Sequence, residues 1–189
     1  MSRVADRSRY SSVAIALHWT IGLIIIGNLV SGMTIDYFFD SPDPVMQQLG
    51  NTIIGLHKSF GLTVIMLTLV RICWRIANPP PPLPAHMTRL EIILSKVSHY
   101  GFYALMLLMP MTGWAMTSTG KTLYPLGWFG VFEVPKLPLD RSMGGFFAQS
   151  HAVLGWMTLA TLALHLLAVA KHHYFDRDNL LARMLPAAR

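Results

Sequence analysis

Charged residues are scarce in this sequence. Asp, Glu, Lys and Arg make up only 13% of its 189 residues, whereas 53% are hydrophobic. Soluble domains carry about 25% charged residues, so the composition argues against an ordinary soluble domain and favours an integral membrane protein. The length leaves room for one compact unit, and we expect a single membrane domain over residues 1–189.

Cysteine is almost absent as well. Cys73 is the only one, which excludes an internal disulfide and any metal or iron–sulfur site built from cysteines. The sequence contains no CxxCH motif, so a covalently attached haem is also excluded. A cofactor in this chain would have to be bound through other side chains.

Long hydrophobic runs, by contrast, occur four times. Each is long enough to cross a bilayer as a helix, and they are separated by proline-rich, acidic or glycine-rich stretches. We therefore predict an all-α fold, an integral membrane four-helix bundle. The transmembrane helices are expected at about residues 10–35, 53–74, 97–118 and 149–171.

The segments between and after these helices have distinct compositions. The run NPPPPLP, residues 78–84, cannot be helical and predicts an extended linker. Thr88 and Glu91 have capping-box spacing, which predicts the start of the third helix. The aromatic-rich segment before the fourth helix, with Phe146, is too interrupted to span, and we expect it to rest in the membrane interface. The tail from Tyr174 is expected to be a short amphipathic segment on the membrane surface.

Basic residues are distributed unequally over the two ends of the helices. Eleven lie on the side that holds both termini and the middle loop, and four lie on the other side. The positive-inside rule therefore places both termini in the cytoplasm. The asymmetry also explains the net charge of +6 without any nucleic-acid partner. The eleven are Arg3, Arg7, Arg9, Arg71, Arg75, Arg89, Lys96, Lys171, Arg177, Arg183 and Arg189, and the four are Lys58, Lys121, Lys136 and Arg141.

Four histidines lie inside the hydrophobic runs at matching depths. His151 and His165 are fourteen residues apart, which brings both to one face of a helix, about 21 Å apart along its axis. Counted from the membrane ends, His18 matches the depth of His165, and His57 matches that of His151. A six-coordinate haem takes one nitrogen on each side of the macrocycle. The spacing therefore predicts two b-type haems, each with two histidine ligands.

Other roles for these histidines are weaker explanations. Hydrogen bonding to neighbouring helices would account for one such residue more easily than for four at matched depths. Zinc ligands converge on one point, whereas these pairs are about 20 Å apart by helix rise. A proton relay stays open, although relays usually include acidic residues, and the predicted spans contain none.

The remaining histidines lie nearer the ends of the helices. His99 sits at the cytoplasmic mouth of the third helix, too shallow to match His18, and two roles are open for it. One is a structural hydrogen bond, and the other is a place near a quinone or a haem propionate. His86, His172 and His173 fall in the linker and at the cytoplasmic boundary, where we expect surface residues.

Two basic residues on the second helix are candidates for tuning a cofactor. Lys58 follows His57 directly, and Arg71 lies fourteen residues beyond His57 on the same face. A guanidinium at that depth can pair with a propionate of the cytoplasmic haem. The alternatives are that Lys58 only snorkels to the interface and that Arg71 only marks the cytoplasmic end of its helix.

Several motifs resemble the bacterial cytochrome b561 family. They are ALHW in the first helix, GLHKSFG in the second, SHAVLG with LH fourteen residues on in the fourth, and the stretches VRICWRIANPPPPLP, STGK…GWFG and KHHYFDRDNLLARMLP. Together they cover nearly the whole chain, which is similar more distantly to the b-type subunits of membrane hydrogenases. The resemblance implies a di-haem cytochrome of the bacterial inner membrane that exchanges electrons with ubiquinone or another quinone. By position it implies the ligands His18, His57, His151 and His165.

Two classes of function stay open on this basis. The first is a quinone-linked oxidoreductase that takes electrons from a periplasmic donor. One branch of the family oxidises superoxide, although the GWFG and HKS sequences are more similar to another branch. The second is an electron-transfer subunit docked to a separate redox enzyme or periplasmic protein. The expected partners are membrane lipid, a quinone and that donor, and a homo-oligomer is also open.

Overall fold

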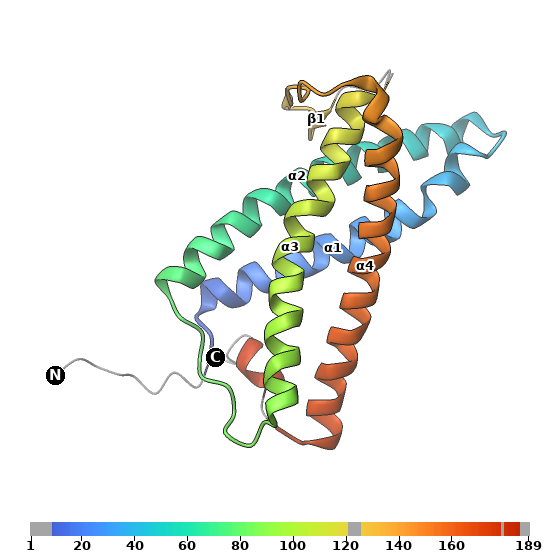
Figure 1. Cartoon of the computed structure of the whole chain (residues 1–189). Helices are drawn as coiled ribbons and strands as arrows, with labels where there is room; N and C mark the ends of the chain where they lie inside the picture. The colour runs from blue at the N-terminus through green and yellow to red at the C-terminus, as the bar shows by residue number, and fades with distance from the viewer. Residues whose placement is uncertain (1–8, 121–125, 179, 186–189) are drawn as a thin grey trace.

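The computed structural model describes residues 9–120, 126–178 and 180–185 (Figure 1). Within them, four helices are long and apolar enough to cross a membrane, which confirms the predicted all-α bundle. These are α1 (Ser12–Phe39), α2 (Pro44–Ala77), α3 (Arg89–Thr119) and α4 (Gly144–Ala170). Of the basic residues counted above, Arg3, Arg7, Lys121 and Arg189 lie outside the described residues.

Local capping explains where the helices start. Thr88 and Glu91 form the expected capping box, because the Thr88 hydroxyl accepts from the Glu91 amide and the Glu91 carboxylate accepts from the Thr88 amide. At α2 the Asp43 carboxylate accepts from the amide of Val45, and Pro44 occupies the first turn. This cap starts α2 well before residue 53. It adds residues 44–52, more than two helical turns, ahead of the hydrophobic run.

The four helices form two antiparallel hairpins that cross each other. In Figure 1, α1 lies along α2, α3 lies along α4, and the first hairpin is steeply inclined to the second. Ile21, Val64 and Met106 pack together where α1, α2 and α3 meet. Most other apolar side chains are exposed on the outside of the bundle, as expected for helices that face lipid.

A short hairpin follows α3 and folds onto α2. Its strands are β1 (Gly127–Trp128) and β2 (Phe132–Glu133), which pair antiparallel. The turn between them places Gly130 at a φ of 74°, a conformation that glycine adopts without strain. The hydroxyl of Ser59 accepts from the Phe129 amide at 3.0 Å, which attaches this turn to α2. Phe146, expected in the interfacial segment, lies instead in the first turn of α4.

The chain after α4 turns back toward the start of the molecule. It continues as a π-helix, η2 (Lys171–Phe175), and later forms a 3-10 helix, η3 (Leu181–Met184). The Trp19 indole donates to the carbonyl of Met184 at 2.7 Å, and the Tyr10 amide donates to the carbonyl of Arg183 at 3.3 Å. The expected surface tail is therefore attached to the first turns of α1.

Candidate functional site

The crossing hairpins bring the four membrane histidines together in two pairs. The ring centroids of His18 and His165 are 6.3 Å apart, and those of His57 and His151 are 6.1 Å apart. Helix α4 contributes one histidine to each pair, while α1 and α2 contribute the others. These are the pairs that depth matching predicts, and their role as ligands stays a prediction.

The separation of the rings fits two ligands on one metal ion. A metal–imidazole bond is about 2.0–2.1 Å long and the ring centre lies roughly 1 Å behind the nitrogen, so two imidazoles on opposite sides of an ion have centroids about 6 Å apart. Both pairs meet this spacing. Edge-to-face ring contacts have centroids about 4.5–7 Å apart, and the interplanar angles of 65° and 74° are of that kind. The spacing therefore permits ligation, and the hydrogen bonds of the ring nitrogens are the further observation that bears on it.

The ring of His57 is fixed in orientation from α1. The hydroxyl of Ser31 donates to the carbonyl of Asn28 at 3.1 Å, so its oxygen accepts from Nδ1 of His57 at 3.0 Å. A Cβ at Gly32 would lie 3.2 Å from Cε1 of this ring, so glycine gives the imidazole its space. With the proton on Nδ1, the lone pair of Nε2 is available to a metal.

The ring of His151 is held in the same way from α3. Its Nδ1 donates to the carbonyl of Met109 at 3.0 Å. A Cβ at Gly113 would lie only 3.0 Å from Cε1 of the ring. Helix α3 therefore fixes the orientation of a predicted ligand on α4, which the sequence did not predict. Hydrogen-bonded Nδ1 and free Nε2 form the usual arrangement of a metal-binding histidine.

Arg71 lies beside the other histidine pair. Its Nη2 is 3.4 Å from Nδ1 of His18, and its Nε donates to the hydroxyl of Tyr103 at 3.3 Å. The side chain therefore crosses from α2 to both α1 and α3. This position agrees with the depth expected for Arg71, and its role toward a cofactor stays a prediction.

His99 is deeper in the structure than its position in the sequence suggested. Its ring centroid is 6.5 Å from that of His165, so the expectation that His99 is too shallow for this pair is wrong. The cause is the inclination of the helices, which depth counted along the sequence does not include. Its Nδ1 donates to the carbonyl of Ser95 at 2.6 Å, which is the structural hydrogen bond considered for it.

Lys58 lies on the same turn of α2 as His57. Its side chain is half-buried, and no hydrogen bond or ion pair joins it to any residue that the structure describes. An ammonium group in this position can compensate a negative charge next to the His57–His151 pair.

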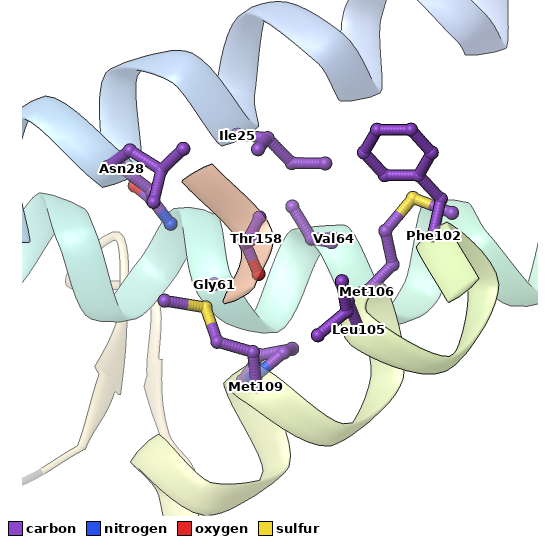
Figure 2. Close-up of a pocket in the computed structure, with 11 residues that line it drawn as sticks. Ile25, Asn28, Gly61, Val64, Phe102, Leu105, Met106, Met109 and Thr158 are labelled. Atoms are coloured by element: carbon purple, nitrogen blue, oxygen red, sulfur yellow. The ribbon is translucent and has the colours of Figure 1, made fainter. Parts of the chain in front are cut away.

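Between the two pairs lies a small, partly open cavity of about 30 Å³ (Figure 2). Residues of all four helices line it, including Asn28, Gly61, Met109 and Thr158. Thr158 is seven residues from each histidine of α4 and therefore lies on the same face, midway between them. The rest of the lining is mostly apolar, so the interior between the pairs is nearly dry.

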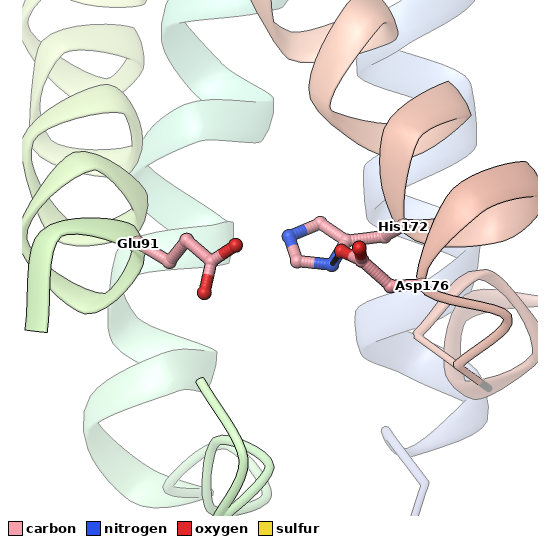
Figure 3. Close-up of side chains that lie close together, drawn as sticks. All are labelled: Glu91, His172 and Asp176. Carbon is pink, nitrogen blue, oxygen red and sulfur yellow. Dashed lines mark ion pairs between the residues drawn. The ribbon is translucent and has the colours of Figure 1, made fainter. Parts of the chain in front are cut away.

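A second cluster of ionisable groups joins α3 to the segment after α4. Figure 3 shows Glu91 opposite His172 and Asp176, whose ligand atoms lie within 4.8 Å of one another. The ammonium of Lys171 is 2.7 Å from a carboxylate oxygen of each acid. The charges are therefore compensated from within the chain, and the cluster is an ion-pair network that fixes the ends of α3 and α4.

Comparison with known proteins gives a consistent picture. A family model described as prokaryotic cytochrome b561 matches residues 9–187. The chain is 31% identical to cytochrome b561 homolog 2 of Escherichia coli (strain K12), over 98% of this chain and 95% of that protein. It is 28% identical to the probable superoxide oxidase CybB of Yersinia pestis, over 96% and 98% of the two chains. It is 29% identical to cytochrome b562 of Cereibacter sphaeroides, over 93% and 94%.

Proposed function

Because this chain belongs to the prokaryotic cytochrome b561 family, we propose that it is a di-haem b cytochrome that passes electrons between a periplasmic donor and the quinone pool. Family membership implies a b-type haem and membrane electron transfer, and the four spans make the chain a multi-pass protein of the bacterial inner membrane. The number of haems, their ligands, the donor and the quinone are the proposed parts.

The observation that carries this proposal is the presence of two histidine pairs at ligand spacing. We assign one haem to His57 and His151 and the other to His18 and His165, because the ring separations of 6.1 and 6.3 Å suit one ion between each pair. A bound haem would gain or lose one electron at a time as its iron changes between the ferric and ferrous states. The residues of the chain orient the ligands, keep the interior nearly dry and place charges nearby.

Lys58 and Arg71 of α2 would each act on a different haem. When Nε2 of His18 ligates iron, its Nδ1 carries the proton and can no longer accept from Arg71. The guanidinium is then available to a carboxylate, and a haem propionate is such a group. Lys58, without a partner among the described residues, would compensate charge at the His57–His151 site. A positive charge near the iron favours the reduced state.

The orientation in the membrane follows from the distribution of basic residues. We infer that both termini are cytoplasmic, which puts His18 and His165 near the cytoplasmic face and His57 and His151 near the periplasmic face. Electrons from a periplasmic donor would then enter at the second pair and leave at the first. The narrow, mostly apolar interior between them separates the two sites by about 20 Å along α4.

A small oxidisable donor such as superoxide is supported by the relative named as a probable superoxide oxidase. Each superoxide would lose one electron and leave as O₂, and two electrons with two protons would convert a quinone to its quinol. A second candidate is a protein donor that docks on the periplasmic side. The β1–β2 turn favours it, because Val131 is 72% and Phe132 54% exposed beside the His57 turn of α2.

Purified protein in lipid nanodiscs separates these candidates. We expect a superoxide-generating system to reduce the haems without any other protein and a soluble quinone analogue to reoxidise them. Superoxide dismutase, which removes the donor, is the control. Haems that respond to the quinone but never to superoxide would favour the protein donor, and haems that respond to neither would contradict both.

A further inference from the structure

We propose that residues 180–185, which we name the C-terminal strap, cover the His18–His165 site against redox molecules dissolved in the water on that side of the membrane. The strap contains η3 and lies between the first turns of α1 and the linker before α3, where Figure 1 shows η3 in red. It would decide which molecules can exchange electrons with a haem at this pair. The inference rests on the proposed function, because a cover matters only if His18 and His165 hold a haem.

The backbone of the strap is bonded to the first turns of α1. The carbonyl of Arg183 accepts from the Tyr10 amide at 3.3 Å, and the next carbonyl, that of Met184, accepts from the Trp19 indole at 2.7 Å. A tail that only rests on the membrane surface would leave these carbonyls to water or to its own helix. The strap is therefore docked on the bundle by its main chain.

The strap is also held on its other sides. The Arg183 guanidinium donates to the carbonyl of Pro82 in the linker at 2.8 Å, and Arg9 donates to the carbonyl of Leu185 at 2.6 Å. Just before the strap, the carboxylate of Asp178 is 7% exposed and lies 3.0 and 3.4 Å from nitrogens of two histidines. These contacts come from α1, from the linker and from the segment after α4, so the strap crosses the end of the bundle.

Trp19 connects the strap to the predicted haem ligand. Its indole bonds to Met184 on one side, and its ring packs edge-to-face on His18 with centroids 5.5 Å apart on the other. The strap is therefore one side chain away from His18. Excluding water from a reactive centre prevents side reactions. Here the side reaction is the loss of one electron from a reduced haem to a dissolved oxidant, which leaves the haem oxidised and the oxidant reduced.

A strap with a purely structural role is the alternative. Such a strap would stabilise α1 against the linker and leave the reactivity of the haem toward dissolved molecules unchanged. A covering strap would slow the reaction with a water-soluble oxidant, and it would do so from one face of the membrane only. The rate of that reaction, measured from each face, therefore separates the two roles.

Oxidation of the reduced haems by ferricyanide tests the cover. Ferricyanide does not cross lipid, and inverted vesicles from cells that overproduce the protein expose the face on which we infer both termini to lie. The chain shortened to residues 1–178 lacks the strap, whereas the chain shortened to residues 1–185 keeps it and is the matched control. We expect stopped-flow oxidation to be roughly ten-fold faster in the 1–178 protein than in the control. Right-side-out vesicles should show no difference.

The charge of the probe makes a faster rate specific to the cover. The 1–178 protein loses Arg183 and Arg189, so it attracts the ferricyanide anion less, and electrostatics alone would slow the oxidation. Equal rates in inverted vesicles with full haem content would overturn the cover and leave the proposed function intact. A gain in right-side-out vesicles alone would keep the cover and reverse the inferred orientation. Absence of a haem at His18 and His165 would contradict the proposed function and the cover with it.

Trypsin provides a second readout that does not depend on haem. The peptide bond after Arg183 is protected while the strap is docked, because both its carbonyl and its guanidinium are bonded. Trp19→Phe removes the donor to Met184, and we expect cleavage after Arg183 in inverted vesicles to become roughly ten-fold faster. Trp156→Phe is the matched control, because Trp156 is 64% exposed on α4. Equal cleavage in both variants and the wild type would show that Trp19 does not hold the strap, which would overturn the inference.

Discussion

At the scale of single residues, the orientations of the His57 and His151 rings depend on atoms that the neighbouring helix provides or leaves out. For His151, the carbonyl of Met109 is an atom that α3 provides, and the side chain of Gly113 is one that it leaves out. The carbonyl fixes the ring through Nδ1 at 3.0 Å, and the missing side chain of Gly113 leaves room for Cε1. The ring cannot move away from a new methyl group without losing that hydrogen bond.

We therefore expect Gly113→Ala to weaken haem binding at the His57–His151 site. A methyl carbon 3.0 Å from Cε1 would displace the ring, and loss of ligand orientation typically costs about 10–100-fold in metal affinity. Gly22→Ala is the control, because a Cβ there would meet nothing within 4 Å. Haem-to-protein ratio after purification is the measurement. Equal haem content in the two variants would show that the ring tolerates the methyl group.

Arg71 gives a second prediction at this scale. Arg71→Gln removes a positive charge next to His18, so the oxidised iron becomes relatively more stable and the potential of that haem falls. A free-energy change of about 1.4 kcal/mol corresponds to about 59 mV for one electron, and we expect a shift of that order. Redox titration should show the shift in one haem only. If the potential is unchanged in a protein with full haem content, Arg71 does not act on the haem and only marks the cytoplasmic end of its helix.

Sequence patterns predicted the histidines of the candidate site but not their surroundings. Periodicity along one helix is enough to place His151 and His165 on one face. It carries no information on Ser31, Gly32 or Met109, which matter only because another helix crosses at that point. His99 was misplaced in depth for the same reason.

At the scale of elements, capping decides where α3 begins. Thr88 and Glu91 satisfy each other's backbone amides, and the same carboxylate is tied to Lys171 after α4. Thr88→Ala should therefore destabilise the fold by about 1 kcal/mol. Thr161→Ala, which removes a hydroxyl that bonds only within α4, is the comparison. Thermal unfolding in detergent should separate the two, and equal midpoints would mean that the cap contributes nothing.

The β1–β2 turn is attached to α2 two residues after His57. Ser59 is 2% exposed and its oxygen accepts from the Phe129 amide. Ser59→Ala leaves that amide unpaired, and we expect the turn to open and a water-soluble reductant such as dithionite to reduce the His57–His151 haem faster. Stopped-flow reduction of the oxidised protein measures this, with Ser98→Ala as the control. An unchanged rate would show that the turn does not cover the site.

The elements themselves were largely predictable because hydrophobic length and caps are local properties. The four spans and the capping box follow from composition and spacing along the chain. The early start of α2 depends on Asp43 and Pro44, whose signal lies outside the hydrophobic run. The attachment of the β1–β2 turn to Ser59 and Thr63 joins residues far apart in sequence, and no local pattern contains it.

At the scale of the whole molecule, the crossing of the two hairpins determines which helix contributes which histidine to the two pairs. Helix α4 contributes a histidine to both pairs, while α1 and α2 contribute one each. Helix α3 orients the His151 ring through the carbonyl of Met109. The proposed path therefore runs along α4 from one pair to the other.

The distribution of charge makes a further prediction for the whole molecule. With both termini on the side of the basic residues, reporters fused to either end should show cytoplasmic activity. A reporter inserted in the loop between α1 and α2, at Ser41, should show periplasmic activity. The opposite pattern would exchange the sides of the two haems and reverse the proposed direction of entry, while the pairing of the histidines would stand.

The most direct test of the central claim is to remove each of the four histidines and identify the haem that is lost. The wild-type protein should contain two non-covalent haems b per chain by pyridine haemochrome, with two redox components. His18→Ala and His165→Ala should lose one component, and His57→Ala and His151→Ala should lose the other, because the ring separations pair them in this way. A single haem in the wild type, or loss of the same component in His18→Ala and His57→Ala, would contradict the account.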